Sequence, residues 1–147
     1  MEVVTDWDDP AFAGRPVPAP SGVAAEYFSA VESGELRYQD CPSCGRRQFY
    51  PRQLCAGCGG EPVWAVSSGR GRVHTFTVVR QNLSPPFASL VPYVLAVVEL
   101  EEGPRLMGNV TDCQVEDVKI GMAVEAYAVR VREGLGVPFW RPQAGSS

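Results

Sequence analysis

The sequence has little of the chemistry that enzymes use. Among its 147 residues it contains one lysine and one histidine, His74. It has no glycine-rich phosphate loop, no metalloprotease helix motif and no nucleophile elbow. His74 is far in sequence from Cys113, so we expect a strand histidine and a free thiol rather than a nucleophile pair. The acidic pairs Glu101–Glu102 and Glu116–Asp117 stand beside turn residues, where we expect solvated side chains. The chain therefore offers no catalytic machinery of its own.

A long hydrophobic segment is also missing. The longest apolar run, Tyr93 to Val98, ends at Glu99 and is too short to cross a bilayer. The first ten residues are acidic and lack the apolar region of a secretory signal. We therefore expect a cytoplasmic protein that does not enter the membrane.

Glycine and proline, in contrast, are abundant. The chain has 15 glycines and 13 prolines, which favours short strands and many turns over a helical bundle. A hydrophobic content of 45% and a charged content of 20% are typical of a globular chain. The length suits one domain, or two small modules that share a core.

The net charge of −4 is unevenly distributed along the chain. Residues 1–45 carry a charge of −6, residues 46–80 carry +5 and residues 81–147 carry −3. The basic middle segment could attract phosphates, and arginine presents a planar fork that suits them. Alternatively, these arginines only solvate a strand-rich surface and offset a negatively charged metal site. The acidic remainder argues against a protein dedicated to duplex DNA.

Four of the five cysteines form two pairs, Cys41 with Cys44 and Cys55 with Cys58, and each pair is followed by glycine. Two intervening residues let one tight turn point both sulfurs at the same ion, and the glycine lets the backbone turn. Two such knuckles on adjacent hairpins complete a tetrahedral four-thiolate site, as in a zinc ribbon. A disulfide framework is the weaker explanation in a cytoplasmic chain. We predict one structural Zn²⁺ per chain. Iron, as in a rubredoxin, is the competing metal and would indicate electron transfer.

The remaining pattern predicts a mainly β protein with a short N-terminal α-helix. We expect an extended proline-rich arm over residues 1–20 and a helix over 22–33 that begins at an N-cap, Ser21. The predicted strands after Trp64 cover residues 72–80, 93–101, 105–111, 123–132 and 137–140. Five strands without βαβ alternation fit a closed barrel of the OB type, with an open six-strand sandwich as the alternative.

These elements divide the chain into five segments. They are the arm (1–20), the N-terminal helix (21–36), a rubredoxin-like zinc ribbon (37–64), an OB-fold β-barrel (65–142) and a tail (143–147).

The order of several short motifs resembles the DUF35 family of acyl-CoA-associated zinc-ribbon/OB-fold proteins. The resemblance covers residues 21–142. It rests on Gly34–Leu36, the two cysteine knuckles, Tyr50–Arg52, Ser68–Gly71, Thr75–Thr77, Pro92–Tyr93, Val98–Leu100, Glu102–Gly103, Ile120–Met122 and Phe139–Pro142.

That resemblance implies a partner. Members of the family look like non-catalytic subunits of thiolase-fold enzymes, including acyltransferases, hydroxymethylglutaryl-CoA synthase assemblies and lipid-transfer-type aldolases, and some accompany enoyl-CoA hydratases. By resemblance, the chain would complete a retro-aldolase (a C–C lyase) that cleaves a steroid side-chain CoA thioester. It would do so in a hetero-oligomer and reach the acyl-CoA through its partner, without nucleic acid or membrane.

Two sets of residues are candidates for such contacts. The docking candidates are apolar residues of a proline-rich loop and of the C-terminal region: Phe87, Leu90, Pro92, Tyr93, Phe139 and Trp140. The last two could instead plug the end of the barrel. The candidates for CoA-phosphate contacts are Arg70, Arg72 and Arg80.

A single-stranded nucleic-acid-binding module is the alternative function, because zinc ribbons and OB folds both bind single strands. It would use the basic segment together with Phe49, Tyr50, Phe76 and Phe87 as stacking platforms.

Overall fold

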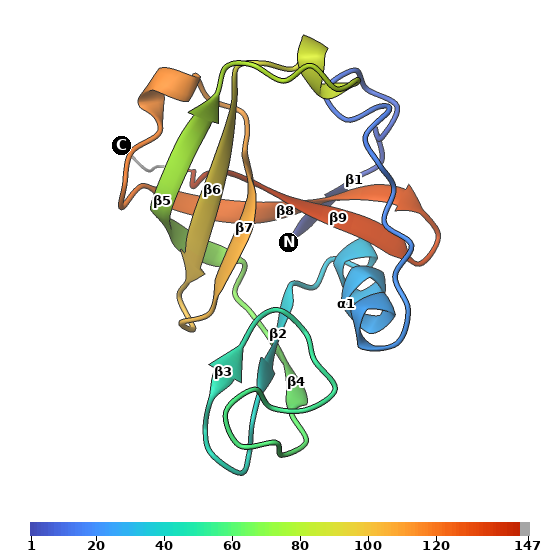
Figure 1. The fold of residues 1–147 in the computed structure, drawn as a ribbon, viewed down its shortest axis with the longest axis vertical. Helices are drawn as coiled ribbons and strands as arrows, with labels where there is room; N and C mark the ends of the chain where they lie inside the picture. Colours follow the sequence, from blue (N-terminus) through green and yellow to red (C-terminus); the bar gives the residue numbers. More distant parts are fainter. Residues whose placement is uncertain (145–147) are drawn as a thin grey trace.

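Six strands form one sheet, and five of them close into a barrel (Figure 1). The computed structural model describes residues 1–144. The barrel strands are β5 (Arg70–Val79), β6 (Tyr93–Leu100), β7 (Arg105–Val110), β8 (Ala123–Arg132) and β9 (Leu135–Pro142). Strands β5, β6 and β7 form an antiparallel meander, and β8 pairs antiparallel with both β5 and β9. One parallel pair between β7 and β9, Val110 with Trp140, completes the circle. This closure confirms the OB-type barrel and excludes the open sandwich.

The barrel interior is filled by alternate residues of its strands. In β6 every second side chain, from Val94 through Ala96 and Val98 to Leu100, is buried. Trp140 of β9 is fully buried in the same cluster, next to Gly108 of β7. Period-two burial is what a strand with one core-facing side produces, so the sequence pattern located these strands closely.

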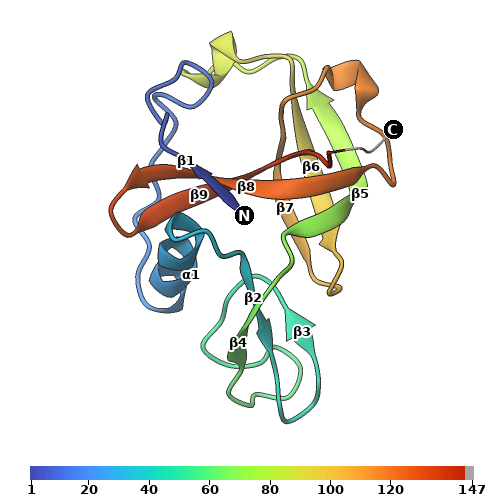
Figure 2. The ribbon, with the colours of Figure 1, turned by 180° about the vertical axis from the view of Figure 1, so that it is seen from behind.

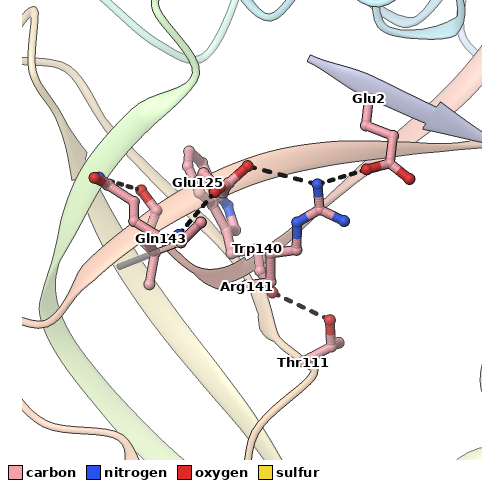
Figure 3. Close-up of polar contacts among 8 residues, drawn as sticks. Glu2, Thr111, Glu125, Trp140, Arg141 and Gln143 are labelled. Carbon is pink, nitrogen blue, oxygen red and sulfur yellow. Dashed lines mark hydrogen bonds and ion pairs between the residues drawn. The ribbon is translucent and has the colours of Figure 1, made fainter. Parts of the chain in front are cut away.

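The first residues of the chain form a strand as well. β1 (Glu2–Val4) runs parallel to β8 over Tyr127–Val129, beyond the part of β8 that pairs with β5 (Figure 2). Arg141 fastens it, because Nη2 contacts the carboxylate of Glu2 at 2.8 Å and that of Glu125 at 3.5 Å (Figure 3). The N-terminal segment expected to be an extended arm therefore begins as a sheet strand. Further along it, the side chain of Phe12 is buried.

Helix α1 (Val23–Glu32) packs across β9. Its buried face carries Tyr27, Ala30 and Val31, the spacing expected of an amphipathic helix. The helix begins after Gly22, whose φ is +58°, and not after Ser21, and no side chain caps it. The predicted helix is confirmed to within one residue at each end, but the predicted cap is wrong.

A second, three-stranded sheet follows the helix, with β2 (Arg37–Asp40) between β3 (Arg47–Gln48) and β4 (Val63–Val66). It carries both cysteine knuckles and joins the barrel through the link from β4 to β5. Two short 3₁₀ helices complete the structure, η1 (Phe87–Ser89) and η2 (Val115–Asp117). Of the predicted tail, Gln143 and Ala144 are described, and both bond to β8, whereas residues 145–147 lie outside the described residues.

In residues 1–144, no helix is both long enough and apolar enough to span a membrane.

Candidate metal centre and apolar cleft

The two knuckles bring all four predicted ligands together. The sulfurs of Cys41, Cys44, Cys55 and Cys58 lie within 4.8 Å of one another. The Cys41 and Cys58 sulfurs are 3.6 Å apart, and those of Cys44 and Cys55 are 3.7 Å apart. A tetrahedral ion with sulfur ligands at about 2.3 Å requires sulfur–sulfur distances of about 3.8 Å. The cluster therefore has the size and the donor set of a four-thiolate metal site.

The backbone around the sulfurs favours thiolates. Gly57 donates its N–H to the Cys55 sulfur at 3.3 Å, and Gly60 donates to the Cys58 sulfur at 3.4 Å. Backbone N–H groups of Cys58 and Gly57 lower the pKa of Cys55 to about 6, and that of Cys44 lowers the pKa of Cys41. The backbone N–H of Arg46 also lowers the pKa of Cys44, but the neighbouring sulfurs of Cys58, Cys55 and Cys41 outweigh it and raise that pKa to about 12. Metal ligands must be deprotonated, so complete deprotonation of the cluster depends on a bound cation.

The turns that allow this geometry need glycine. Gly45 and Gly59 follow the second cysteine of each knuckle, and both have a φ of +76°. In each knuckle the glycine N–H returns to the carbonyl of the first cysteine, Cys41 or Cys55. This left-handed backbone is costly for other residues, which explains the repeated Cys-Gly sequence.

Two buried glutamines, Gln39 and Gln48, support the second knuckle through hydrogen bonds. Gln48 donates to Gln39 at 2.7 Å and accepts from the backbone N–H of Ala56 at 2.9 Å. Gln39 in turn exchanges hydrogen bonds with the backbone of Arg52, both at 2.8 Å. This polar network fixes the loop between the knuckles. The network was not predictable from the sequence, because nothing in the local pattern distinguishes a buried glutamine from a solvated one.

The fifth cysteine stands apart from the metal cluster. Cys113 is a half-buried free thiol in the segment after β7. Burial raises its pKa, and the carboxylates of Asp117 and Asp112 raise it further. A thiol held in the neutral form is a poor nucleophile. His74 is exposed, at an irregularity of β5 where the register with β6 shifts.

The proposed docking residues divide into two groups. Phe87, Leu90 and Tyr93 are half-buried and Pro92 is exposed, in or beside the segment that links β5 to β6. Phe139 and Trp140, with exposed fractions of 3% and 0%, are buried in the barrel wall and core. In this conformation their side chains have no surface to offer a partner, so we drop them as docking residues. Trp140 fills the barrel core, whereas Phe139 packs in a second cluster with Phe12, Tyr127 and Val129 and lines an apolar cleft.

The arginines considered for CoA phosphates are also separated. Arg70 and Arg72 are exposed at the start of β5, whereas Arg80 follows its other end, ten residues further on. An extended strand of that length spans roughly 30 Å, so the three cannot hold one phosphate group. Arg72 donates to the carbonyl of Gly121 at 2.9 Å.

Three of the four aromatic residues considered for base stacking, Phe49, Tyr50 and Phe87, line one cleft, and Phe76 does not. Phe49 packs on the ring of Tyr27, with ring centroids 5.0 Å apart. Phe76 packs against the barrel core, and the ring of Phe87 faces Arg15. Tyr50 is the exposed one, at 55%.

An apolar cleft of about 610 Å³, which the sequence did not predict, lies among the described residues. Its walls come from the N-terminal arm, α1, the loop after β3, η1, β7 and β9, and the lining is mostly aromatic and aliphatic. These segments are far apart in sequence, so no local pattern could have indicated the cleft.

A helix, a four-cysteine ribbon and a closed five-strand barrel define the class of zinc-ribbon/OB-fold proteins. Two family models match in that order: the "ChsH2, rubredoxin-like zinc ribbon domain" over residues 28–63 and the "ChsH2, C-terminal OB-fold domain" over residues 64–129. The chain belongs to the DUF35 family, because it is 42% identical over 96 residues to a "DUF35 domain-containing scaffold protein" of Methanocaldococcus jannaschii. That match covers 63% of this chain and 67% of the relative.

Two further similarities come from larger systems. A solved structure described as "Ltp2-ChsH2(DUF35) aldolase" superposes with a TM-score of 0.74 and 31% identity, over 85% of this chain and 98% of that one. The "3-oxo-4,17-pregnadiene-20-carboxyl-CoA hydratase alpha subunit" of Mycobacterium tuberculosis is 36% identical over 110 residues. That match covers 74% of this chain but 34% of the hydratase subunit, so the chain corresponds to about a third of that relative.

Proposed function

We propose that the chain is a non-catalytic accessory subunit that binds and completes a thiolase-like acyl-CoA enzyme. The enzyme we infer is a retro-aldolase, a C–C lyase that cleaves a steroid side-chain CoA thioester. The observation that carries this proposal is the similarity, over nearly all of the matched chain, to a DUF35 chain whose description joins it with Ltp2 in an aldolase. The pregnadiene-carboxyl-CoA named for the hydratase relative supports a steroid thioester as the substrate.

The residues of this chain support an accessory role. The described residues contain one histidine, which is exposed, and the thiol outside the metal cluster has a raised pKa. The four remaining cysteines surround one site, and four protein ligands leave no open position for a substrate. A subunit of this kind contributes binding surface and positioning, and the reacting groups belong to its partner.

We propose that the ion of the four-cysteine site is a structural Zn²⁺, one per chain. The described sulfur positions fit a tetrahedral ion, and the matching ribbon family is named for zinc. Bound there, the ion would hold the two knuckles together and take no part in the reaction.

The docking surface that we propose is the segment between β5 and β6. It carries Leu83, whose exposed fraction is 83%, together with the half-buried Phe87, Leu90 and Val91. Clusters of exposed apolar groups of this kind are typical of protein interfaces.

The test is assembly followed by activity. Tagged chain is captured from its native lysate with nuclease added, the retained thiolase-fold protein is identified, and the two are purified together. We expect a near-stoichiometric complex in which C–C cleavage of a steroid side-chain CoA thioester requires both chains. A partner that is fully soluble and fully active alone would refute the proposal. Recovery of nucleic-acid-processing proteins would favour the single-strand-binding alternative.

A matched pair of variants locates the interface. Leu83→Asp places a charge in the proposed docking segment, where 83% of the side chain is exposed, and Ile120→Asp places one on the turn before β8, where 71% is exposed. We expect the first to weaken assembly at least tenfold and the second to leave it unchanged, with circular dichroism confirming that both fold. If the two variants changed assembly equally, the segment between β5 and β6 would not be the docking surface.

A further inference from the structure

The apolar cleft contains one charged residue. Among the residues that line it within 1–144, Arg15 alone carries a charge, and the others are mainly aromatic, aliphatic or proline. Tyr27, Leu106 and Phe139, which form part of its wall, are nearly fully buried. A guanidinium in such surroundings loses part of its hydration. This loss disfavours the charged form and lowers the pKa of Arg15.

The guanidinium of Arg15 is held in a defined position. Its Cζ lies 5.5 Å from the ring centre of Phe87 and 5.3 Å from that of Phe139, so both rings can attract the cation. One nitrogen donates to the side-chain oxygen of Asn109 at 3.1 Å, and Nε donates to the carbonyl of Ala11 at 3.3 Å. Asn109 is itself fixed, because its amide donates to the carbonyl of Val94 at 3.0 Å. The charged group is therefore preorganised by β6, β7, β9 and the loop with η1.

Arg15 lacks an anionic partner in its own chain. Its described acceptors are neutral oxygens, and no ion pair within residues 1–144 involves it. A guanidinium has five N–H donors, so several remain for a ligand. Charges that are partly removed from water are stabilised by pairing, and a pairing group for Arg15 would come from outside the described residues.

We propose that the cleft binds a small organic anion, with an apolar body against the aromatic walls and one carboxylate on Arg15. The volume of about 610 Å³ lies within the range of small-molecule sites. A single cation in an otherwise uncharged cleft complements a single negative charge, and the planar guanidinium fork suits a carboxylate. This site does not depend on the proposed assembly role, since every residue in it belongs to this chain.

The test compares two probes that differ only in charge. The zinc-loaded full chain is titrated with 1-pyrenebutyrate and with its neutral amide, 1-pyrenebutanamide, at physiological ionic strength, and binding is followed by fluorescence anisotropy. We expect the carboxylate to bind at least about tenfold more tightly than the amide, the contribution of a charge-assisted hydrogen bond. The comparison uses the unmodified protein, so it does not depend on how any variant folds.

Three variants assign the charge effect to Arg15. Arg15→Gln should remove the preference for the carboxylate and leave amide binding within about twofold, whereas Arg15→Lys should keep part of the preference. Arg132→Gln removes an exposed arginine outside the cleft and should behave as the unmodified chain.

Three outcomes would overturn the proposal. The first is equal affinity of the unmodified chain for both probes. The second is a preference that persists in Arg15→Gln. The third is the absence of saturable binding of either probe up to about 1 mM, a concentration well above the dissociation constant expected of a preorganised site. In that case we would interpret the cleft as a surface for a protein partner.

Discussion

At the scale of single residues, Glu102 in the turn between β6 and β7 links the ribbon and the start of β5 to the barrel. Its carboxylate accepts from the hydroxyl of Ser67 at 2.7 Å and from the backbone N–H of Ser68 at 2.9 Å, just before β5. Its backbone carbonyl accepts from Arg47 of the ribbon at 2.8 Å. Burial alone would raise the pKa of Glu102, but the hydrogen bonds from Ser68 and Ser67 outweigh it and lower the pKa below its ordinary value.

This lowered pKa predicts how the contribution of Glu102 changes with pH. Because the folded-state pKa is depressed, the stabilisation is present above the unfolded-state pKa and is lost as the pH falls through the folded-state pKa. We expect Glu102→Gln to destabilise the chain by about 0.5–1 kcal/mol at pH 7, and to have a shrinking effect below about pH 4. Thermal unfolding between pH 7 and pH 3 measures this difference, with Glu116→Gln in the exposed η2 as the control. A difference that stays constant with pH would contradict the role of the charge.

Glu102 also illustrates what the sequence could and could not reveal at this scale. The four cysteine ligands were predictable because each pair forms within one turn and its spacing carries the geometry. Glu102 was expected to be a solvated turn residue. Its partners Ser67 and Ser68 lie 35 and 34 positions away, so the local sequence does not indicate these contacts. Arg15 and Asn109 are 94 positions apart. Polar contacts over such separations leave no periodic or spacing signal in a single sequence.

At the scale of secondary structure elements, α1 approaches β9 so closely that the strand needs a glycine. A Cβ at Gly136 would lie 2.6 Å from the backbone N and Cα of Glu32, at the end of the helix. Nearby, Glu32 pairs with Arg130 of β8 at 3.0 Å, which holds the helix over the hairpin of β8 and β9. The helix was predictable from its own periodicity, whereas its docking site depends on a glycine about a hundred positions further on.

We therefore expect Gly136→Ala to push the helix away from the barrel. Backbone atoms cannot yield as the end of a flexible side chain can, so the cost should be about 1–3 kcal/mol. Denaturant unfolding gives the free energy, and amide hydrogen exchange shows whether the loss is concentrated in α1. An unchanged free energy of unfolding would mean that the helix adjusts without loss of packing, contrary to this account.

The same scale explains why the arm was not predicted to be a strand. β1 contains three residues, and its partner in β8 is about 125 positions later. Three residues are too few for a period-two pattern, and the pairing depends on Arg141 and on the free edge that β8 leaves beyond β5. In contrast, the barrel strands of six to ten residues were all located by their composition.

At the scale of the whole molecule, the ribbon and the barrel are stabilised by different means. The barrel has a core of buried side chains, including Val73, Val98, Val124 and Trp140. The knuckles of the ribbon instead surround four sulfurs and two glutamines, with little apolar material between them. A segment with so small a core needs a metal to fold, while the barrel can hold its structure without one.

Metal removal should therefore unfold the chain in part. We expect purified protein to contain about one zinc per chain and to be colourless, which metal analysis checks against iron. Stripping the metal with a chelator should make amides of β2–β4 exchange rapidly while those of β6 and β8 stay protected, and Cys55→Ser should reproduce this pattern. Lower pH should favour release, because protons compete with the metal for the thiolates.

Cys113→Ser is the matched control for that experiment, because Cys113 lies outside the metal cluster and should leave both zinc content and exchange unchanged. If β6 and β8 lost protection together with the ribbon, the two parts would form one cooperative unit. The hydrogen bond between Ser67 and Glu102, and the packing of Phe49 on Tyr27, would then couple metal binding to the stability of the barrel. If β2–β4 stayed protected without metal, the glutamine network alone would hold the ribbon, and the assignment of a structural metal would fail.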